Sequence, residues 1–201
     1  MSGLRVGGFV PLTTIDFPGR LAAVVFCQGC PWRCSYCHNP QLIPAGAEAE
    51  RPWQAVLDFL ARRRGLLDGV VFSGGEPTLQ AALPQALRDV CALGFETALH
   101  TAGMYPERLA AVLPLLDWVG LDIKGPAEHY DAITATPGSA TAVQRSLALL
   151  LASGVDHECR TTWHAGLFGK AELDRLGAEL GRRGVRRWKV QPCSMDGLRS
   201  A

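Results

Sequence analysis

The stretch FCQGCPWRCSYCHNP, residues 26–40, contains four cysteines and decides how the whole chain is interpreted. Cys30, Cys34 and Cys37 follow the spacing C-x3-C-x2-C, and Cys27 adds a C-x2-C step before them. A structural zinc site usually separates two cysteine pairs by a longer spacer, whereas these pairs are only three residues apart. Four thiols could close around one metal ion. Alternatively, three could hold an iron–sulfur cube and leave one iron open to a substrate.

Length and composition predict a single folded domain. The chain has 201 residues, of which 48% are hydrophobic and 19% are charged, which is enough for one normal core. Lys and Arg number 20 and Asp and Glu number 19, so bulk charge does not indicate a nucleic-acid or membrane partner. We expect one domain over residues 1–201, with an N-terminal arm or hairpin at 1–20, a barrel at 21–191 and a short tail at 192–201.

The cysteine usage and the absence of a long apolar segment predict a cytoplasmic location. No run of about 18 apolar residues could span a bilayer, and the N-terminus does not read as a signal peptide. The seven cysteines are an odd number, and four of them crowd into one loop. In a reducing compartment such a cluster more often binds a metal than forms disulfides.

From residue 21 onward, short apolar runs alternate with amphipathic stretches rich in Ala and Leu. Such alternation predicts parallel strands joined by right-handed helical crossovers, in an open doubly wound sheet or a partial barrel. The expected strands are Leu21–Phe26, Gly69–Phe72, Phe95–His100, Trp118–Ile123, Val155–Trp163 and Val185–Val190. The expected helices are Pro52–Arg64, Gln80–Leu93, Pro106–Leu116, Ala140–Ser153 and Lys170–Arg183.

Polar segments lie at the C-terminal ends of five of the expected strands. They are residues 27–39, 73–78, 100–103, 122–124 and 161–164. In parallel β/α folds the chemistry gathers where the strands end. We therefore expect these segments to meet in one active site.

The combination of these segments resembles the radical S-adenosylmethionine (radical SAM) superfamily. The cysteine spacing with Tyr36 before the last cysteine is similar to that family's signature, and SGGEPTLQ and LDIKGP follow at later strand ends. With TIDFPG before the first strand, the pattern resembles glycyl-radical-enzyme activating proteins, closest to those of anaerobic ribonucleoside-triphosphate reductase. The resemblance extends from about Gly7 to Gln191. It implies an α/β fold, a partial (β/α)6 TIM-like barrel of the radical SAM type.

The resemblance also implies cofactors and site residues. Cys30, Cys34 and Cys37 would bind a [4Fe–4S] cluster, and the cluster would cleave SAM to give a radical that removes a hydrogen atom from a partner's glycine. No protein side chain beyond the cluster and SAM is expected to be catalytic. The partner would be a glycyl radical enzyme such as the anaerobic reductase, and a reduced flavodoxin or ferredoxin would donate the electron. The SAM-binding set would be Tyr36, Gly74, Gly75, Glu76, Thr101, Asp122, Lys124, Arg160 and His164.

Several of these positions carry specific expectations. The Glu76 carboxylate could accept a hydrogen bond from the ligand's ammonium group. Asp122 and Lys124 should point the same way because they are two residues apart on a strand, and the same alternation groups Arg160 with Thr162 and His164. No separate substrate domain is visible, which favours a macromolecular partner that closes the cavity itself.

Three residues depart from the family pattern. Related activators often have a residue other than cysteine at Cys27, which we interpret as a small buried residue. A ligand swap, a reactive thiol, or zinc binding in mis-assembled protein are the alternatives. His100 and Ala102 stand where an acidic residue and an asparagine are common, which puts in doubt any cation or SAM-carboxylate contact there.

Two other functions compete with the activase. The first is a radical SAM enzyme acting on a small molecule, similar to 7-carboxy-7-deazaguanine synthase. The second is a zinc-knuckle binding module without catalysis. SAM cleavage would exclude the zinc module, and a glycyl radical on a partner would exclude the small-molecule enzyme.

Overall fold

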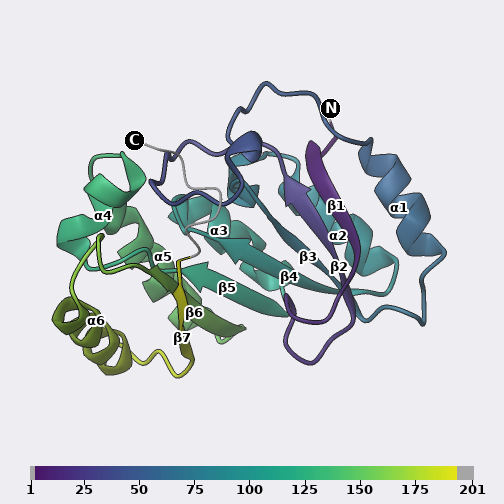
Figure 1. Ribbon diagram of the computed structural model, residues 1–201. Helices are drawn as coiled ribbons and strands as arrows, with labels where there is room; N and C mark the ends of the chain where they lie inside the picture. Colours follow the sequence, from purple (N-terminus) through teal and green to yellow (C-terminus); the bar gives the residue numbers. More distant parts are fainter. Residues whose placement is uncertain (1–2, 194–201) are drawn as a thin grey trace.

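Six parallel strands and one antiparallel strand form a single sheet in residues 3–193, the part of the chain that this computed structural model describes (Figure 1). The strands lie side by side in the order of the sequence. They are β1 (Val6–Thr13), β2 (Ala22–Cys27), β3 (Gly69–Gly74), β4 (Glu96–Thr101), β5 (Trp118–Asp122), β6 (Asp156–Trp163) and β7 (Trp188–Pro192). A doubly wound sheet would reverse direction at a switch point. The sequential order therefore identifies an open, partial barrel, as predicted.

Six α-helices and three short 3-10 helices connect the strands. The α-helices are α1 (Trp53–Ala61), α2 (Leu83–Ala92), α3 (Pro106–Val112), α4 (Ala127–Thr134), α5 (Ser139–Ser153) and α6 (Lys170–Arg182). The 3-10 helices are η1 (Pro40–Leu42), η2 (Pro77–Leu79) and η3 (Leu113–Leu115). None of the helices in residues 3–193 is both long enough and apolar enough to cross a membrane.

The last strand and one additional helix differ from the expected elements. The last strand begins at Trp188 rather than Val185, because the Val185 amide donates to the Leu180 carbonyl and closes the end of α6. Helix α4 was not predicted: it has eight residues, of which only three are buried, so its apolar periodicity is weak. The predicted tail at 192–201 lies outside the described residues beyond position 193.

The N-terminal segment forms the predicted hairpin. Strand β1 pairs antiparallel with β2, and the chain between them turns under the sheet. There the Phe17 ring lies 6.2 Å from the Trp118 ring, and the Asp16 carbonyl accepts a hydrogen bond from His100 at 2.8 Å. The hairpin tip thus covers the lower part of the sheet's inner face.

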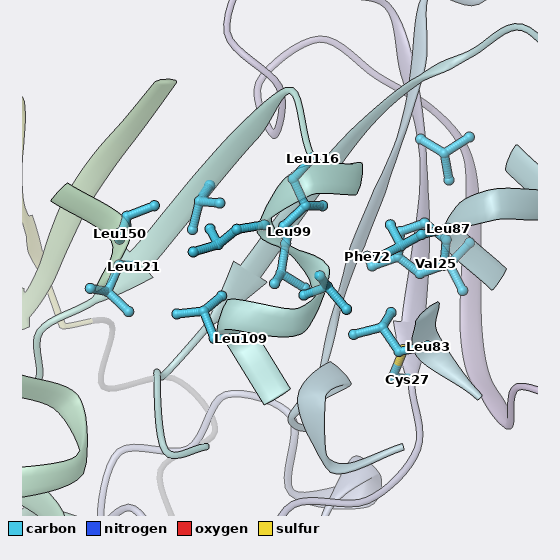
Figure 2. Close-up of a cluster of buried hydrophobic side chains, with 14 of the residues drawn as sticks. Val25, Cys27, Phe72, Leu83, Leu87, Leu99, Leu109, Leu116, Leu121 and Leu150 are labelled. Atoms are coloured by element: carbon cyan, nitrogen blue, oxygen red, sulfur yellow. The ribbon is translucent and has the colours of Figure 1, made fainter. Parts of the chain in front are cut away.

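Side chains alternate between two environments along every central strand. One set, which includes Val25, Cys27, Phe72, Leu99 and Leu121, joins the large core under the helices (Figure 2). The other set faces the inside of the partial barrel, with small or apolar residues at the bottom and polar residues near the strand ends. Because neighbouring side chains of a strand point to opposite faces, this alternation separates the core from the cavity.

Candidate active site

A cavity of about 200 Å³ lies inside the partial barrel at the carboxyl ends of β3–β6. It collects most of the predicted site residues: Cys30, Cys34, Tyr36, Cys37, Gly74, Gly75, Thr101, Asp122, Lys124 and Arg160. Trp32, His38 and Asn39 also line it and were not predicted. Their position inside the cysteine-bearing segment was the only available signal, because none of them belongs to a recognisable motif.

The cysteine loop is held by backbone hydrogen bonds to two other segments. On one side the amides of Gly29 and Cys30 donate to the carbonyls of Leu42 and Ile43, at 2.7 and 3.1 Å. On the other side the amides of Arg33 and Ser35 donate to the carbonyls of Thr134 and Ile133, at 3.0 and 3.1 Å. Helix α4, which was missed in the sequence, therefore supports the loop that carries the candidate metal ligands.

The three thiols line one cavity but do not all lie within 4.8 Å of one another. Tetrahedral zinc with bonds of about 2.3 Å would need its sulfurs about 3.8 Å apart. Among residues 3–193, only Glu128, His129 and Glu172 bring three potential ligand atoms within 4.8 Å of one another. The sulfurs of Cys30, Cys34 and Cys37 are more widely spread, yet all three line one cavity. This spacing is compatible with a polynuclear cluster, whose iron corners bind separate thiolates.

Cys27 lies on the other face of the sheet from the cavity. It is fully buried in the helix-facing core and does not line the cavity. Burial raises the pKa of its thiol, and the nearby Glu76 adds to the shift. The structure therefore agrees with the interpretation of Cys27 as a small core residue.

The two glycines of SGGEP bring the third strand's loop against the base of the cysteine loop. A Cβ on Gly75 would lie 2.3 Å from the Gly29 carbonyl oxygen. Gly74 has a φ of +111°, and a Cβ there would lie 2.4 Å from the Cys27 amide nitrogen. Only glycine allows this approach, which lets the Glu76 amide donate to the Gly29 carbonyl at 2.8 Å.

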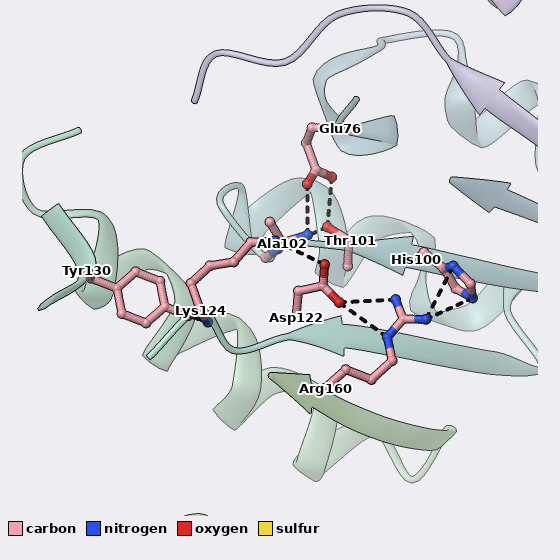
Figure 3. Close-up of polar contacts among 9 residues, drawn as sticks. Glu76, His100, Thr101, Ala102, Asp122, Lys124, Tyr130 and Arg160 are labelled. Atoms are coloured by element: carbon pink, nitrogen blue, oxygen red, sulfur yellow. Dashed lines mark hydrogen bonds and ion pairs between the residues drawn. The ribbon is translucent and has the colours of Figure 1, made fainter. Parts of the chain in front are cut away.

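Glu76 holds the cavity wall and does not line the cavity (Figure 3). Its buried carboxylate accepts hydrogen bonds from the Thr78 amide and hydroxyl, at 3.0 and 2.6 Å. It also accepts from the Thr101 hydroxyl at 2.7 Å and the Ala102 amide at 2.9 Å. Burial raises the pKa of Glu76, and these bonds oppose the shift. Three of these donors share Oε1 and only the Ala102 amide reaches Oε2, so Oε2 keeps acceptor capacity. The expected contact with a ligand ammonium group stays a prediction.

Asp122 is the centre of a charged group on the cavity floor. Its carboxylate accepts from Lys124 Nζ at 3.1 Å and from Arg160 Nε at 3.2 Å. Burial opposes its charge, but Lys124 and Arg160 lower the pKa of Asp122 to about 2. The two cations against one carboxylate leave a positive charge facing the cavity. The structure thus brings together the predicted Asp122, Lys124 and Arg160.

Arg160 reaches across β5 because Gly120 leaves room for it. A Cβ on Gly120 would lie 3.0 Å from the guanidinium carbon, and Gly120 is paired in register with His100 on β4. Arg160 Nη1 therefore lies 3.4 Å from His100 Nδ1 (Figure 3). Since a carbonyl can only accept, the bond to Asp16 places the His100 hydrogen on Nε2. Burial and the charge of Arg160 lower the pKa of His100 to about 4.

His164 is not part of this arrangement. Strand β6 ends at Trp163, so the alternation that would direct His164 to the side of Arg160 and Thr162 stops before it. The His164 ring accepts a hydrogen bond from the Gly166 amide at 3.1 Å and does not line the cavity. The structure thus places His164 beyond the strand and outside the cavity lining, and its binding of SAM stays a prediction.

Comparison with known proteins identifies the family. A profile of the radical SAM superfamily matches residues 24–175. The chain belongs to the radical SAM superfamily. Its cofactors are accordingly a [4Fe–4S] cluster and SAM. The cavity offers residues that fit both cofactors, because three thiols that could bind the cluster lie beside charged side chains that could bind SAM.

Curated relatives indicate the group within the superfamily. A protein of Methanocaldococcus jannaschii with the provisional name glycyl-radical enzyme activating enzyme is 32% identical over 85% of this chain and 73% of its own. The pyruvate formate-lyase-activating enzyme of Clostridium pasteurianum is 38% identical over 60% of this chain. The chain spans about half (52%) of that enzyme. The chain is thus an enzyme of the radical SAM activating type.

Solved structures share the fold. SuiB of Streptococcus suis superposes with a TM-score of 0.69 at 14% identity, over 86% of this chain and 40% of SuiB. The enzyme anSMEcpe with bound AdoMet gives 0.65 at 19% identity, over 83% of this chain and 49% of that protein. At these identities the likeness supports the partial-barrel architecture alone.

The positions of the cysteines predict different metal contents for two variants. Cys27→Ala should keep the iron content of the reconstituted protein, because its thiol faces the core, and lower stability by about 1–2 kcal/mol. Cys30→Ala should lose most of the iron. Iron and sulfide analysis after anaerobic reconstitution measures both. Equal iron loss in the two variants would show that Cys27 is a ligand.

Substituting Gly120 should displace Arg160. In Gly120→Ala the added methyl group would meet the guanidinium and the Trp118 ring, at a cost of about 1–3 kcal/mol. We expect a lower thermal midpoint and weaker SAM binding by calorimetry. Gly181→Ala is the matched control, since nothing lies within 4 Å of its Cβ position. Unchanged SAM affinity in Gly120→Ala would show that the position of Arg160 does not matter for binding.

His100 should make the protein less stable in mild acid. With a folded pKa of about 4 against about 6.5 unfolded, the unfolded chain binds the proton first, so stability falls as pH drops from 6.5 to 4. The loss should reach roughly 2–3 kcal/mol. In His100→Asn this part of the slope should vanish, as measured by denaturant unfolding at each pH. If the free energy of unfolding depends on pH in the same way in the native protein and in His100→Asn, His100 is not the cause of the acid sensitivity.

Proposed function

We propose that this protein cleaves SAM reductively and generates a glycyl radical on anaerobic ribonucleoside-triphosphate reductase. One observation carries the proposal: three thiols and the charged group around Asp122 line the same cavity. The cluster ligands and the charges that could bind an amino-acid ligand thus come from separate strand ends and converge. The family membership supplies the reaction class.

The cavity residues have distinct roles in this proposal. Cys30, Cys34 and Cys37 bind the cluster, and Asp122 with Lys124 and Arg160 receives the ammonium and carboxylate groups of SAM. When bound and reduced, the cluster supplies the electron that breaks a carbon–sulfur bond of SAM. The protein orients the ligand, and the partner's glycine segment closes the cavity and excludes water.

Two kinds of partner are candidates. The resemblance of the TIDFPG and LDIKGP segments supports the anaerobic reductase. The curated relatives include pyruvate formate-lyase-activating enzymes of Clostridium pasteurianum and Listeria monocytogenes, which supports pyruvate formate-lyase as the second candidate. Both are glycyl radical enzymes, so the same cavity serves either.

The test combines SAM cleavage with radical detection. The reconstituted protein, reduced with dithionite, should release 5′-deoxyadenosine from SAM. Electron paramagnetic resonance with each candidate partner should then show a glycyl radical with the reductase. A glycyl radical that forms on pyruvate formate-lyase and not on the reductase would identify pyruvate formate-lyase as the partner instead. Cleavage stimulated by a small pterin, with no protein radical, would favour the small-molecule enzyme, and absence of cleavage would refute the proposal.

A further inference from the structure

Three arginines surround the outer side of the cysteine loop. Arg33 lies within the loop, and its Nη1 donates to the carbonyls of Cys30 and Trp32 at 2.9 and 3.1 Å. Arg108 of α3 donates to the carbonyls of Thr78 and Leu79, at 3.1 and 2.7 Å. Arg5 donates to the Ala45 carbonyl. Each guanidinium is thus fixed by backbone groups.

The segments that these arginines bind meet at the residue before the first cluster ligand. A Cβ placed on Gly29 would lie 2.9 Å from a Leu79 methyl group and 3.3 Å from the Ala45 Cα. Arg5 and Arg108 therefore bind the two segments that flank Gly29, and Arg33 binds the carbonyl of Cys30 itself. We call Arg5, Arg33 and Arg108 the arginine arc.

The arginine arc carries positive charge without a compensating carboxylate. Within residues 3–193 none of its members forms an ion pair, although seven other arginines do. Glu107, next to Arg108 in the sequence, pairs with Arg145 instead. Glu50, whose amide donates to the carbonyl of Val6 beside Arg5, pairs with Arg51. Arg33 and Arg108 are exposed, and Arg5 is half-buried. The arc therefore presents fixed positive charges to solvent.

The location of the arc indicates what it could bind. The thiols face the cavity on their inner side, where SAM is proposed to bind, so a protein reductant must approach from outside the loop. None of the three arginines lines the cavity, so the arc lies outside it. A positive surface steers an acidic protein toward it and speeds encounter, which suits a short-lived electron-transfer complex.

We propose that the arginine arc is the docking surface for an acidic one-electron donor protein of the flavodoxin type. The inference rests on the proposed function, because it needs the cluster to be the electron acceptor. One electron leaves the donor's reduced flavin and one electron enters the cluster, with no bond made or broken on this chain. The three arginines position the donor and do not themselves carry the electron.

The first test measures binding. Oxidised flavodoxin is titrated into cluster-free and reconstituted protein by calorimetry, at low and high ionic strength. The Arg5→Gln/Arg33→Gln/Arg108→Gln variant should bind roughly tenfold more weakly at low salt and lose most of the salt dependence. The matched control is Arg62→Gln/Arg63→Gln/Arg64→Gln, which removes the same charge at the opposite end of the strands and should bind like the native protein. Equal affinity of the two variants would overturn the proposal.

The second test separates electron delivery from chemistry. With dithionite, a small reductant that needs no docking, the arc variant should release 5′-deoxyadenosine within about twofold of the native rate. With reduced flavodoxin the rate should fall roughly tenfold. If the arc variant has the same rate relative to the native protein with dithionite as with reduced flavodoxin, the arginine arc is not a docking surface. Absence of cleavage by the native protein with dithionite would instead refute the proposed function.

The arginines also hold loops, so a variant that preserves charge is needed. Arg5→Lys/Arg33→Lys/Arg108→Lys should restore flavodoxin binding even where the lost carbonyl contacts reduce iron content. If the glutamine and lysine variants lose flavodoxin binding equally, the arginines act only as loop supports and the proposal is wrong.

Discussion

The parallel register of β2–β6 is the constraint on which the rest of the structure depends. Backbone hydrogen bonds between neighbouring parallel strands bring all their carboxyl ends to one edge of the sheet. The pleat then divides the side chains, with Val25, Phe72 and Leu99 under the helices and His100, Asp122 and Arg160 toward the cavity. A shift of one residue in any strand would exchange the two sets.

The same strand register places the charged side chains together on the cavity floor. Arg160 and Asp122 are direct register partners, and Gly120 lets the guanidinium lie across the strand toward His100. The neutral form of His100 can lie beside the Arg160 guanidinium, whereas a protonated imidazolium would be repelled by it. The hairpin tip fixes its tautomer from below through the Asp16 carbonyl. Residues that are far apart in the sequence thus together set the electrostatic potential inside the cavity.

The loops above the strands depend on backbone contacts more than on side chains. Gly74 and Gly75 bring the third strand's loop to the base of the cysteine loop, and Glu76 collects donors from Thr78, Thr101 and Ala102. Such a buried carboxylate is stable only while its hydrogen bonds are made. The motif is therefore important to the cavity mainly as a support.

The sequence by itself determined the strand-and-helix alternation, because periodicity is a local property. Its resemblance to the radical SAM signature proposed Cys30, Cys34 and Cys37 as the cluster ligands. The sequence also placed Asp122, Lys124 and Arg160 at strand ends. Tertiary structure alone decided that Glu76 hydrogen-bonds to the cavity wall without lining the cavity, and that His164 lies beyond its strand. It also decided the role of α4 in holding the cysteine loop. Those outcomes depend on where strands end and which segments meet, and contacts between distant residues set both.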